Sequence, residues 1–412
     1  MIIDTISLFF TVLFLFVVIS YYIFALLPAR RYRSYRGSER IAILIPARNE
    51  ARVIARAIEA VIDARWNGEK DIIVIDDGSD DATSEVARRY PVVVLRNDRH
   101  RGKSRSLNRA LDHTEARLIC VVDADSTVRP DALENLVEPL GDMRVGAVTS
   151  TIGVVNRSML PNPFVHIELL YNSLIRSILS KLNGNVVTPG PLSCYRRDAL
   201  ESVGYFPTDV YSEDVDLTVR IIRAGYLVAV AERARVDTVM PTIPREFKRQ
   251  RMRFSRGVIF IFRRHLSISR RFIDFYTIPL LLFTYLQSTI MGSITVIKIV
   301  QGITLFSPSD VVGIARFLFD WLTMNGFIRW AGAIASGAEP LTAFAVFGLL
   351  SSALTYPLYA LAIARYDRFH IRDVLAIFFL PIFWLVLSIF YLIAATEFFT
   401  RSQENRWKKN ER

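Results

Sequence analysis

A nearly uninterrupted apolar run extends from Ile6 to Leu27, and it constrains the fold of this chain more than any other feature. A helix needs about 20 apolar residues to cross the hydrocarbon core of a bilayer, and this run has that length. A cleaved secretory signal would begin with basic residues and end at small ones, whereas here Asp4 precedes the run and arginines follow it. We therefore expect a retained transmembrane helix in residues 1–30.

The segment after this run is strongly basic. Short loops rich in Lys and Arg beside a membrane span stay on the cytoplasmic side, so we expect a multi-pass protein of the cell membrane whose next domain is cytoplasmic. The formal net charge of +11 also suits contact with a lipid bilayer. Since no known nucleic-acid-binding module is present, we expect no nucleic acid partner. The arginines of this segment are Arg30, Arg31, Arg33, Arg36 and Arg40.

Residues 41–242 follow a different pattern, in which short apolar runs alternate with amphipathic stretches. The runs are rich in Val and Ile, which predicts strands, and the stretches between them have helical spacing. This alternation predicts an α/β domain with a mostly parallel sheet and helices on both faces. The expected strands are Ile41–Pro46, Asp71–Asp76, Val92–Leu95 and Leu118–Asp123, and the expected helices are Ala51–Ala64, Asp80–Tyr90 and Lys103–Asp112.

Acidic residues follow three of these strands, at the edge where such sheets bind ligands. Glu50 follows the first, Asp77 the second, and Asp123 and Asp125 the fourth. If residues 121–125 stay extended, the side chains of Asp123 and Asp125 share a face, because alternate residues of a strand point the same way. Mg²⁺ or Mn²⁺ can bind one or two carboxylates together with phosphate oxygens. A solvated turn is the alternative for such a triplet when it stands alone.

Three further residues have both a plain and a functional interpretation. Asp77 lies in a turn sequence, yet its carboxylate could also accept hydrogen bonds from a nucleoside. Lys103 opens a predicted helix, whose amino end favours phosphate, although a plain surface lysine is equally compatible. Asp214 follows Glu213 at the start of a helical pattern, where acidic residues interact well with the helix dipole. A functional role is the alternative.

The two cysteines, Cys120 and Cys194, have no metal-ligand spacing. A cytoplasmic setting disfavours a disulfide. We interpret both as small packing residues.

The second half of the chain returns to the membrane. Residues 243–271 alternate apolar and basic residues, which is typical of amphipathic helices at the membrane interface. Residues 272–399 predict an α-helical transmembrane region, and residues 400–412 form a basic tail. Candidate spans lie near Tyr276–Val300, Leu341–Ala364 and Ile371–Ala395, and Val311–Trp330 is ambiguous because charged residues interrupt it.

The last candidate span raises a conflict of topology. Basic residues precede it, around Arg365, and follow it in the tail, so both flanks favour the cytoplasm. A single crossing cannot have both flanks on one side. Either residues 371–395 are re-entrant, or the loop at Arg365 lies outside.

Seven motifs in this order resemble the membrane-integrated family 2 glycosyltransferases, the group that contains hyaluronan, chitin-oligosaccharide, poly-N-acetylglucosamine and cellulose synthases. The resemblance covers residues 41–265. Its motifs are Ile45-Pro46-Ala47-Arg48-Asn49-Glu50, Asp76-Asp77-Gly78-Ser79, Arg101-Gly102-Lys103 to Asn108, Val122-Asp123-Ala124-Asp125, Gly190-Pro191-Leu192-Ser193-Cys194-Tyr195-Arg196-Arg197, Ser212-Glu213-Asp214, and Gln250 to Phe254.

The resemblance implies a GT-A-like fold and a nucleotide-diphosphate sugar donor. It makes Asp214 the catalytic base, and it assigns the diphosphate and the metal to Asp123 and Asp125. Gln250, Arg253 and Phe254 match a Q-x-x-R-W pattern, with Phe in place of Trp; the arginine would contact the diphosphate and the ring would floor the acceptor site. The other expected substrate-binding residues are Glu50, Asp77, Lys103 and Glu213.

This chemistry needs one base for the acceptor hydroxyl and positive charge on the leaving diphosphate. A single displacement inverts the anomeric centre, so an α-linked donor, UDP-GlcNAc or UDP-Glc by resemblance, should give a β-linkage. Two enzymes fit: a processive polysaccharide synthase, which several spans favour, and a transferase that adds one sugar to a polyprenyl or other lipid-linked acceptor. A non-catalytic nucleotide sensor is the alternative from another class.

Overall fold

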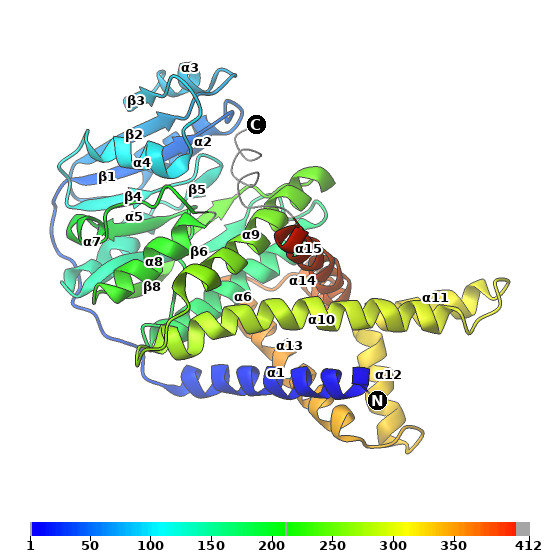
Figure 1. Cartoon of the computed structure of the whole chain (residues 1–412). Coiled ribbons are helices and arrows are strands. Elements are labelled where there is room, and N and C mark those ends of the chain that lie inside the picture. The colour runs from blue at the N-terminus through cyan, green and yellow to red at the C-terminus, as the bar shows by residue number, and fades with distance from the viewer. Residues whose placement is uncertain (1, 211, 401–412) are drawn as a thin grey trace.

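The structure is a computed structural model that describes residues 2–210 and 212–400 of the chain. An α/β domain occupies one end of the molecule, and long helices extend from it (Figure 1). The predicted basic tail, apart from residue 400, and Tyr211 lie outside the described residues.

The α/β domain is built on one eight-stranded sheet with the order β3-β2-β1-β4-β7-β6-β8-β5. β1 pairs in parallel with β2 and β4, β2 with β3, and β6 with β8, whereas β7 runs antiparallel between β4 and β6 and β5 runs antiparallel to β8. The predicted mostly parallel sheet is therefore confirmed. The strands are β1 (Ile41–Ala47), β2 (Lys70–Asp76), β3 (Val93–Arg96), β4 (Leu118–Val121), β5 (Ser126–Val128), β6 (Val145–Val154), β7 (Ser193–Arg196) and β8 (Leu227–Thr238).

Helices cover both faces of the sheet, as its sequence pattern predicts. Along β1, Ile43 packs into the core on one face and Leu44 into the core on the other, because successive side chains of a strand alternate. Burying one such side chain stabilises the fold by about 1.5–3 kcal/mol. The helices of this domain are α2 (Ile54–Asp63), α3 (Thr83–Ala87), α4 (Lys103–Leu111), α5 (Ala132–Val137), the 3₁₀ turn Glu138–Gly141, α6 (Asn162–Ser180), α7 (Arg197–Ser202) and α8 (Glu213–Arg223).

Cys120 and Cys194 lie opposite each other on the neighbouring strands β4 and β7. Both are free thiols, and both are fully buried. Burial raises the pKa of the Cys120 thiol well above its usual value. The two side chains act as small packing residues where β4 and β7 pair.

Three long helices run between the α/β domain and the far end of the molecule: α1 (Ile2–Leu26), α10 (Ile278–Ile303) and α13 (Ala343–Tyr366). α1 is tied to the domain by Lys181, whose Nζ donates to the carbonyl of Leu27 at 2.7 Å. The far ends of α1 and α10 meet where Lys298 pairs with Asp4 at 3.8 Å. Among the described residues, these helices and Leu380–Glu397 are apolar and long enough to cross a membrane.

Two predicted segments of the apolar region are broken. The ambiguous segment forms α11 (Val311–Leu322) and α12 (Met324–Ala335), which are bent by 93°. The candidate span over residues 371–395 divides at Phe379 into α14 (Ile371–Phe378) and α15 (Leu380–Thr400), and the part that is apolar and long enough to cross a membrane is Leu380–Glu397.

Both flanks of this divided segment form ion pairs with other parts of the chain. Before it, Asp367 pairs with Arg157 of the α/β domain at 2.8 Å. After it, Glu397 pairs with Arg256 of α9 (Pro244–His265), the amphipathic helix that leaves the domain. Both flanks therefore lie beside the α/β domain. The re-entrant segment and the outside loop both stay open as predictions.

Candidate active site

The predicted acidic residues converge at one edge of the sheet. β2, β1 and β4 are neighbours and run parallel, so their carboxyl ends lie side by side. Asp77, Glu50 and Asp123 follow these three strands in the chain. Glu50 lies near enough to Asp125 and Asp123 for their charges to affect its pKa. The edge that positions ligands in parallel sheets is thus lined with carboxylates.

The extended conformation expected for residues 121–125 is wrong. β4 ends at Val121, and the amide of Ser126 donates to the carbonyl of Asp123 at 3.0 Å, which closes a turn. The carboxylates of Asp123 and Asp125 are therefore positioned by a turn and not by strand alternation. Asp125 accepts hydrogen bonds from Ser126 at 3.1 Å and from Thr238 on β8 at 3.2 Å.

Lys103 is the cation at the centre of this cluster. It begins α4, and its Nζ lies 2.5 Å from Asp123 and 3.7 Å from Glu213. Burial lowers its pKa, but these two carboxylates outweigh burial and hold the pKa well above the usual lysine value. Gly190 lies against the pair, since a Cβ there would be 2.4 Å from Lys103 Nζ and 2.6 Å from Asp123 Oδ2.

Asp214 lies in the first turn of α8, beside Glu213. Burial, and then the charge of Glu213, raise its pKa to about 6, although Lys103 and Arg253 act in the opposite direction. Behind it, the Thr218 hydroxyl donates to the Asp214 carbonyl at 2.5 Å. A carboxyl group with this pKa is mostly ionised at neutral pH and is still basic enough to accept a proton.

The remaining carboxylates of the edge repel one another. Burial raises the pKa of Glu50 to about 7, with contributions from Asp125 and Asp123. Burial and the charge of Asp123 raise the pKa of Asp125 to about 6. A divalent cation would relieve this repulsion. The described residues contain no group of three metal-ligating side chains, but two carboxylates together with phosphate oxygens suit Mg²⁺ or Mn²⁺. Asp123 and Asp125 therefore fit the predicted metal.

The loop that leads into α4 donates hydrogen bonds to the carboxylate of Asp77. Its carboxylate accepts hydrogen bonds from the amides of Arg101 and Gly102, both at 2.8 Å, and from Asn97 at 2.8 Å. Gly102 has a φ of +93°, which glycine adopts at little cost, so the loop can turn its amides toward Asp77. Burial raises the pKa of Asp77, but these hydrogen bonds lower it further than burial raises it. Asp77 thus positions Lys103, and its contact with a nucleoside stays a prediction.

The three predicted residues of α9 differ in their contacts. Arg253 lies near enough to Asp214 to lower its pKa, and its guanidinium is 5.6 Å from the centre of the Phe254 ring. Phe254 is 45% exposed. Gln250 contacts Met240, and its Oε1 is buried with no partner among the described residues. The structure therefore joins Arg253 to the cluster, whereas its described contacts leave Gln250 and Phe254 outside.

No individual role was predicted from the sequence for two residues that the structure brings close to the site. Gly190 reads as part of a Pro-Gly-Pro turn, and only the fold reveals its contact with Lys103 and Asp123. Arg176 is buried on α6, where burial lowers its pKa to about 10 and the charge of Asp214 acts to raise it. An arginine among the apolar residues of a helix could have marked it, because such burial requires partners.

Comparisons with known proteins agree on the family and on the fold. Residues 42–204 match the family model Glycosyl transferase family 2. Over 230 residues the chain is 28% identical to the "Probable glycosyltransferase YdaM" of Bacillus subtilis, covering 53% of this chain and 55% of the relative. Over 227 residues it is 27% identical to a "Poly-beta-1,6-N-acetyl-D-glucosamine synthase" of Staphylococcus epidermidis, covering 53% and 54%. The chain thus spans about half the length of the curated relatives it matches.

One solved structure is similar along nearly the whole chain. It is the "Mannosyltransferase PcManGT from Pyrobaculum calidifontis in complex with GDP-Man and Mn2+", with a TM-score of 0.61, 21% sequence identity and coverage of 96% of each chain. This likeness concerns the fold. With the family match, it confirms the GT-A-like architecture expected from the sequence.

Proposed function

We propose that the protein is a membrane-bound inverting glycosyltransferase that extends a glycan from a nucleotide-diphosphate sugar, and the match of residues 42–204 to the model Glycosyl transferase family 2 supports this proposal. The convergence of Asp123, Asp125, Lys103 and Asp214 at the carboxyl edge of the sheet carries this proposal. These are the groups that the reaction needs: ligands for a cation, a positive charge for a diphosphate, and a base.

The diphosphate would lie beside Lys103 and Arg253. Both side chains are cationic, and both lie close enough to Asp214 to affect its pKa. Mg²⁺ or Mn²⁺, held by Asp123 and Asp125, would add charge stabilisation for the departing diphosphate. Lys103 pairs with Asp123, so a diphosphate at this position would compete with that carboxylate for the lysine.

Asp214 is the proposed base. Its carboxylate would take the proton of the acceptor hydroxyl while that oxygen attacks the anomeric carbon and the diphosphate leaves from the opposite face. One displacement inverts the centre, so an α-linked donor gives a β-linked product. Glu213 would keep Lys103 in place, since the two groups lie 3.7 Å apart.

We propose UDP-GlcNAc or UDP-Glc as the donor and a growing polysaccharide as the acceptor. The similarity to a poly-N-acetylglucosamine synthase supports this choice. Phe254 is exposed beside Arg253 and offers a flat apolar face on which a pyranose ring can stack. α9, which carries both residues, leads directly to the apolar helices, so the product would form beside the membrane.

The test uses the full chain in mild detergent with radiolabelled UDP-GlcNAc or UDP-Glc and Mg²⁺ or Mn²⁺. Products are separated by size and by extraction into organic solvent. We expect long water-soluble chains that disappear in Asp214→Asn and persist in the control Glu201→Gln, which changes an exposed carboxylate on α7. Label in a single organic-extractable species would replace the polymer proposal with single-sugar transfer to a lipid-linked acceptor. No transfer and no UDP release with either donor would overturn the proposed activity.

A further inference from the structure

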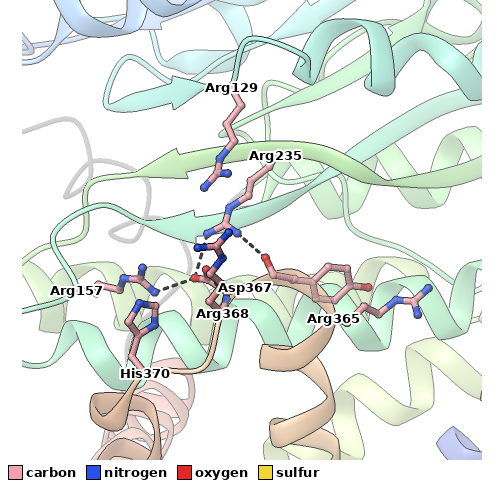
Figure 2. Close-up of a pocket in the computed structure, with 8 residues that line it drawn as sticks. Arg129, Arg157, Arg235, Arg365, Asp367, Arg368 and His370 are labelled. Atoms are coloured by element: carbon pink, nitrogen blue, oxygen red, sulfur yellow. Dashed lines mark hydrogen bonds and ion pairs between the residues drawn. The ribbon is translucent and has the colours of Figure 1, made fainter.

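A second charged site lies at the junction between the α/β domain and the long helices. It is a pocket of about 510 Å³, formed by the loop between α13 and α14 together with residues of the domain (Figure 2). Its lining residues are Arg129, Arg157, Arg235, Arg365, Tyr366, Asp367, Arg368 and His370. Neither the sequence motifs nor the proposed reaction uses these residues.

The lining carries an excess of positive charge. Asp367 is its one carboxylate, and it accepts contacts from Arg157 at 2.8 Å and Arg235 at 3.2 Å. Two carboxylates outside the lining pair with two of the three remaining arginines: Asp237 lies 3.3 Å from Arg129, and Glu232 lies 2.6 Å from Arg365. Five guanidinium groups thus face three carboxylates. The side chain of Arg368 is exposed and forms no ion pair within 4 Å with a carboxylate of the described residues.

Contacts within the protein fix the positions of two pocket arginines. Arg235 is fixed between Asp237, at 3.3 Å, and Asp367, so its position does not depend on a bound anion. Arg157 also contacts His166, at 3.1 Å. Guanidinium groups present planar pairs of N–H donors that match phosphate oxygens. Fixing these groups in advance lowers the entropy that binding would otherwise cost.

Apolar side chains are exposed next to the pocket. Phe369 and Ile371 flank the lining residue His370, and Leu375 lies one turn further along α14. A soluble anion would make no favourable contact with these apolar side chains. A lipid could contact both features, because its headgroup can enter the pocket while its acyl chains lie along the helix.

We propose that this junction pocket binds a phosphate group, and that an anionic phospholipid headgroup carries it. The pocket should prefer ligands with a net negative charge, because Asp367 does not neutralise the positive charges of Arg129 and Arg368. The site is separate from the acidic sheet edge, so its test does not depend on the proposed transfer reaction.

The experiment measures lipid retention by native mass spectrometry on the full chain in mild detergent. Dioleoylphosphatidylglycerol is titrated against dioleoylphosphatidylcholine, which carries a phosphate but no net charge. We expect preferential binding of the anionic lipid, and a loss of affinity of about fivefold for each of Arg129→Gln and Arg368→Gln, since one arginine at the membrane surface contributes that much. The control Arg88→Gln changes an exposed arginine on the far side of the domain and should leave binding unchanged.

Both test residues are accessible, with Arg129 48% exposed, so the variants should fold, and thermal unfolding checks this. Competition with inorganic pyrophosphate and phosphate identifies the source of the phosphate group. If these ions displace the lipid and bind more tightly than it, the lipid assignment is overturned. If Arg129→Gln and Arg368→Gln retain the anionic lipid as the unaltered protein does, the pocket is not the site and the proposal fails.

Discussion

The carboxylates of the sheet edge and those of the junction lie in opposite electrostatic surroundings. At the edge, burial and like charge raise the pKa of Asp125 to about 6 and that of Glu50 to about 7. At the junction, burial acts on Asp367 in the same direction, but the contacts with His166 and Arg235 outweigh it and hold the pKa far below its usual value. The ionised form of a carboxyl group is thus disfavoured at the sheet edge and strongly stabilised at the junction.

This difference separates two ways of using charge. A charge that the fold leaves insufficiently compensated is available to a ligand of opposite sign, so the edge is suited to cations and to accepting protons. A charge enclosed by its counter-ions contributes to stability instead. The junction combines the two, because its carboxylates are compensated while its arginines are in excess. Four experiments test whether the two regions differ in this way.

The largest effect is expected at the edge. Asp214→Asn should lower the transfer rate on the order of 10³-fold, because the acceptor hydroxyl loses its base. The melting temperature should stay the same or rise, since the substitution removes a buried charge whose pKa is unfavourably raised. Initial rates at saturating donor and thermal unfolding in detergent measure both quantities. A rate within tenfold of the unaltered protein would assign the base elsewhere.

The junction should respond in the opposite sense. Asp367→Asn leaves Arg157 and Arg235 without their shared carboxylate, and breaking such a pair should lower the free energy of unfolding by about 3 kcal/mol. Asp125→Asn, the matched change at the edge, should not destabilise. Thermal unfolding of both variants provides the comparison. Equal destabilisation by the two would show that the regions do not differ as described.

The pH dependence of the rate tests the edge directly. Asp214 acts as a base only when ionised, and its pKa is raised to about 6, so the rate should fall about tenfold for each pH unit below pH 6. The two regions should also differ in how pH changes the free energy of unfolding. A carboxyl group whose pKa is higher in the folded protein than in the unfolded chain, such as Asp214, contributes stability that is lost as pH rises through the folded pKa. Asp367 has a depressed pKa, so its contribution to stability is lost as pH falls. A pH–rate profile at saturating donor with an apparent pKa near 4 would contradict the assignment.

The smallest effect concerns Gly190. A Cβ at this position would lie 2.4 Å from Lys103 Nζ, so Gly190→Ala should displace the lysine and lower the rate about fivefold with little change in stability. In the control Gly332→Ala, the added Cβ meets no atom within 4 Å. Comparison of the two rates isolates the contact. Full activity in Gly190→Ala would mean that the Lys103–Asp123 pair tolerates movement.

The central strands could be predicted because they are buried on both faces. β1 and β2 each differ from the expected range by one residue, since their apolar runs are continuous. The conformation of Asp123 to Asp125 could not be predicted, because the hydrogen bond from Ser126 closes a turn in a sequence that reads as extended. The predicted ends of the strands nevertheless identified the edge of the sheet at which the carboxylates meet.

The rest depends on contacts between distant parts of the chain. Gly190 reaches Lys103 only after β7 inserts antiparallel beside β4. Hydropathy could not predict the neighbours of the two flanks of residues 371–397, because these flanks form ion pairs with Arg157 and Arg256, which are distant in the sequence. Pro381, at the start of α15, is the signal that could have located the break at Phe379, since proline favours the first turn of a helix.

The buried cysteines make this chain suited to thiol labelling. Cys120 and Cys194 are its only cysteines, and both lie fully inside the sheet, so a membrane-impermeant maleimide should react with neither in the folded protein. A single cysteine introduced at Ser307 or at Arg368 would then be the sole reactive thiol. Labelling each in intact cells and in inverted vesicles would show which face of the membrane carries the α/β domain, without first removing any native residue.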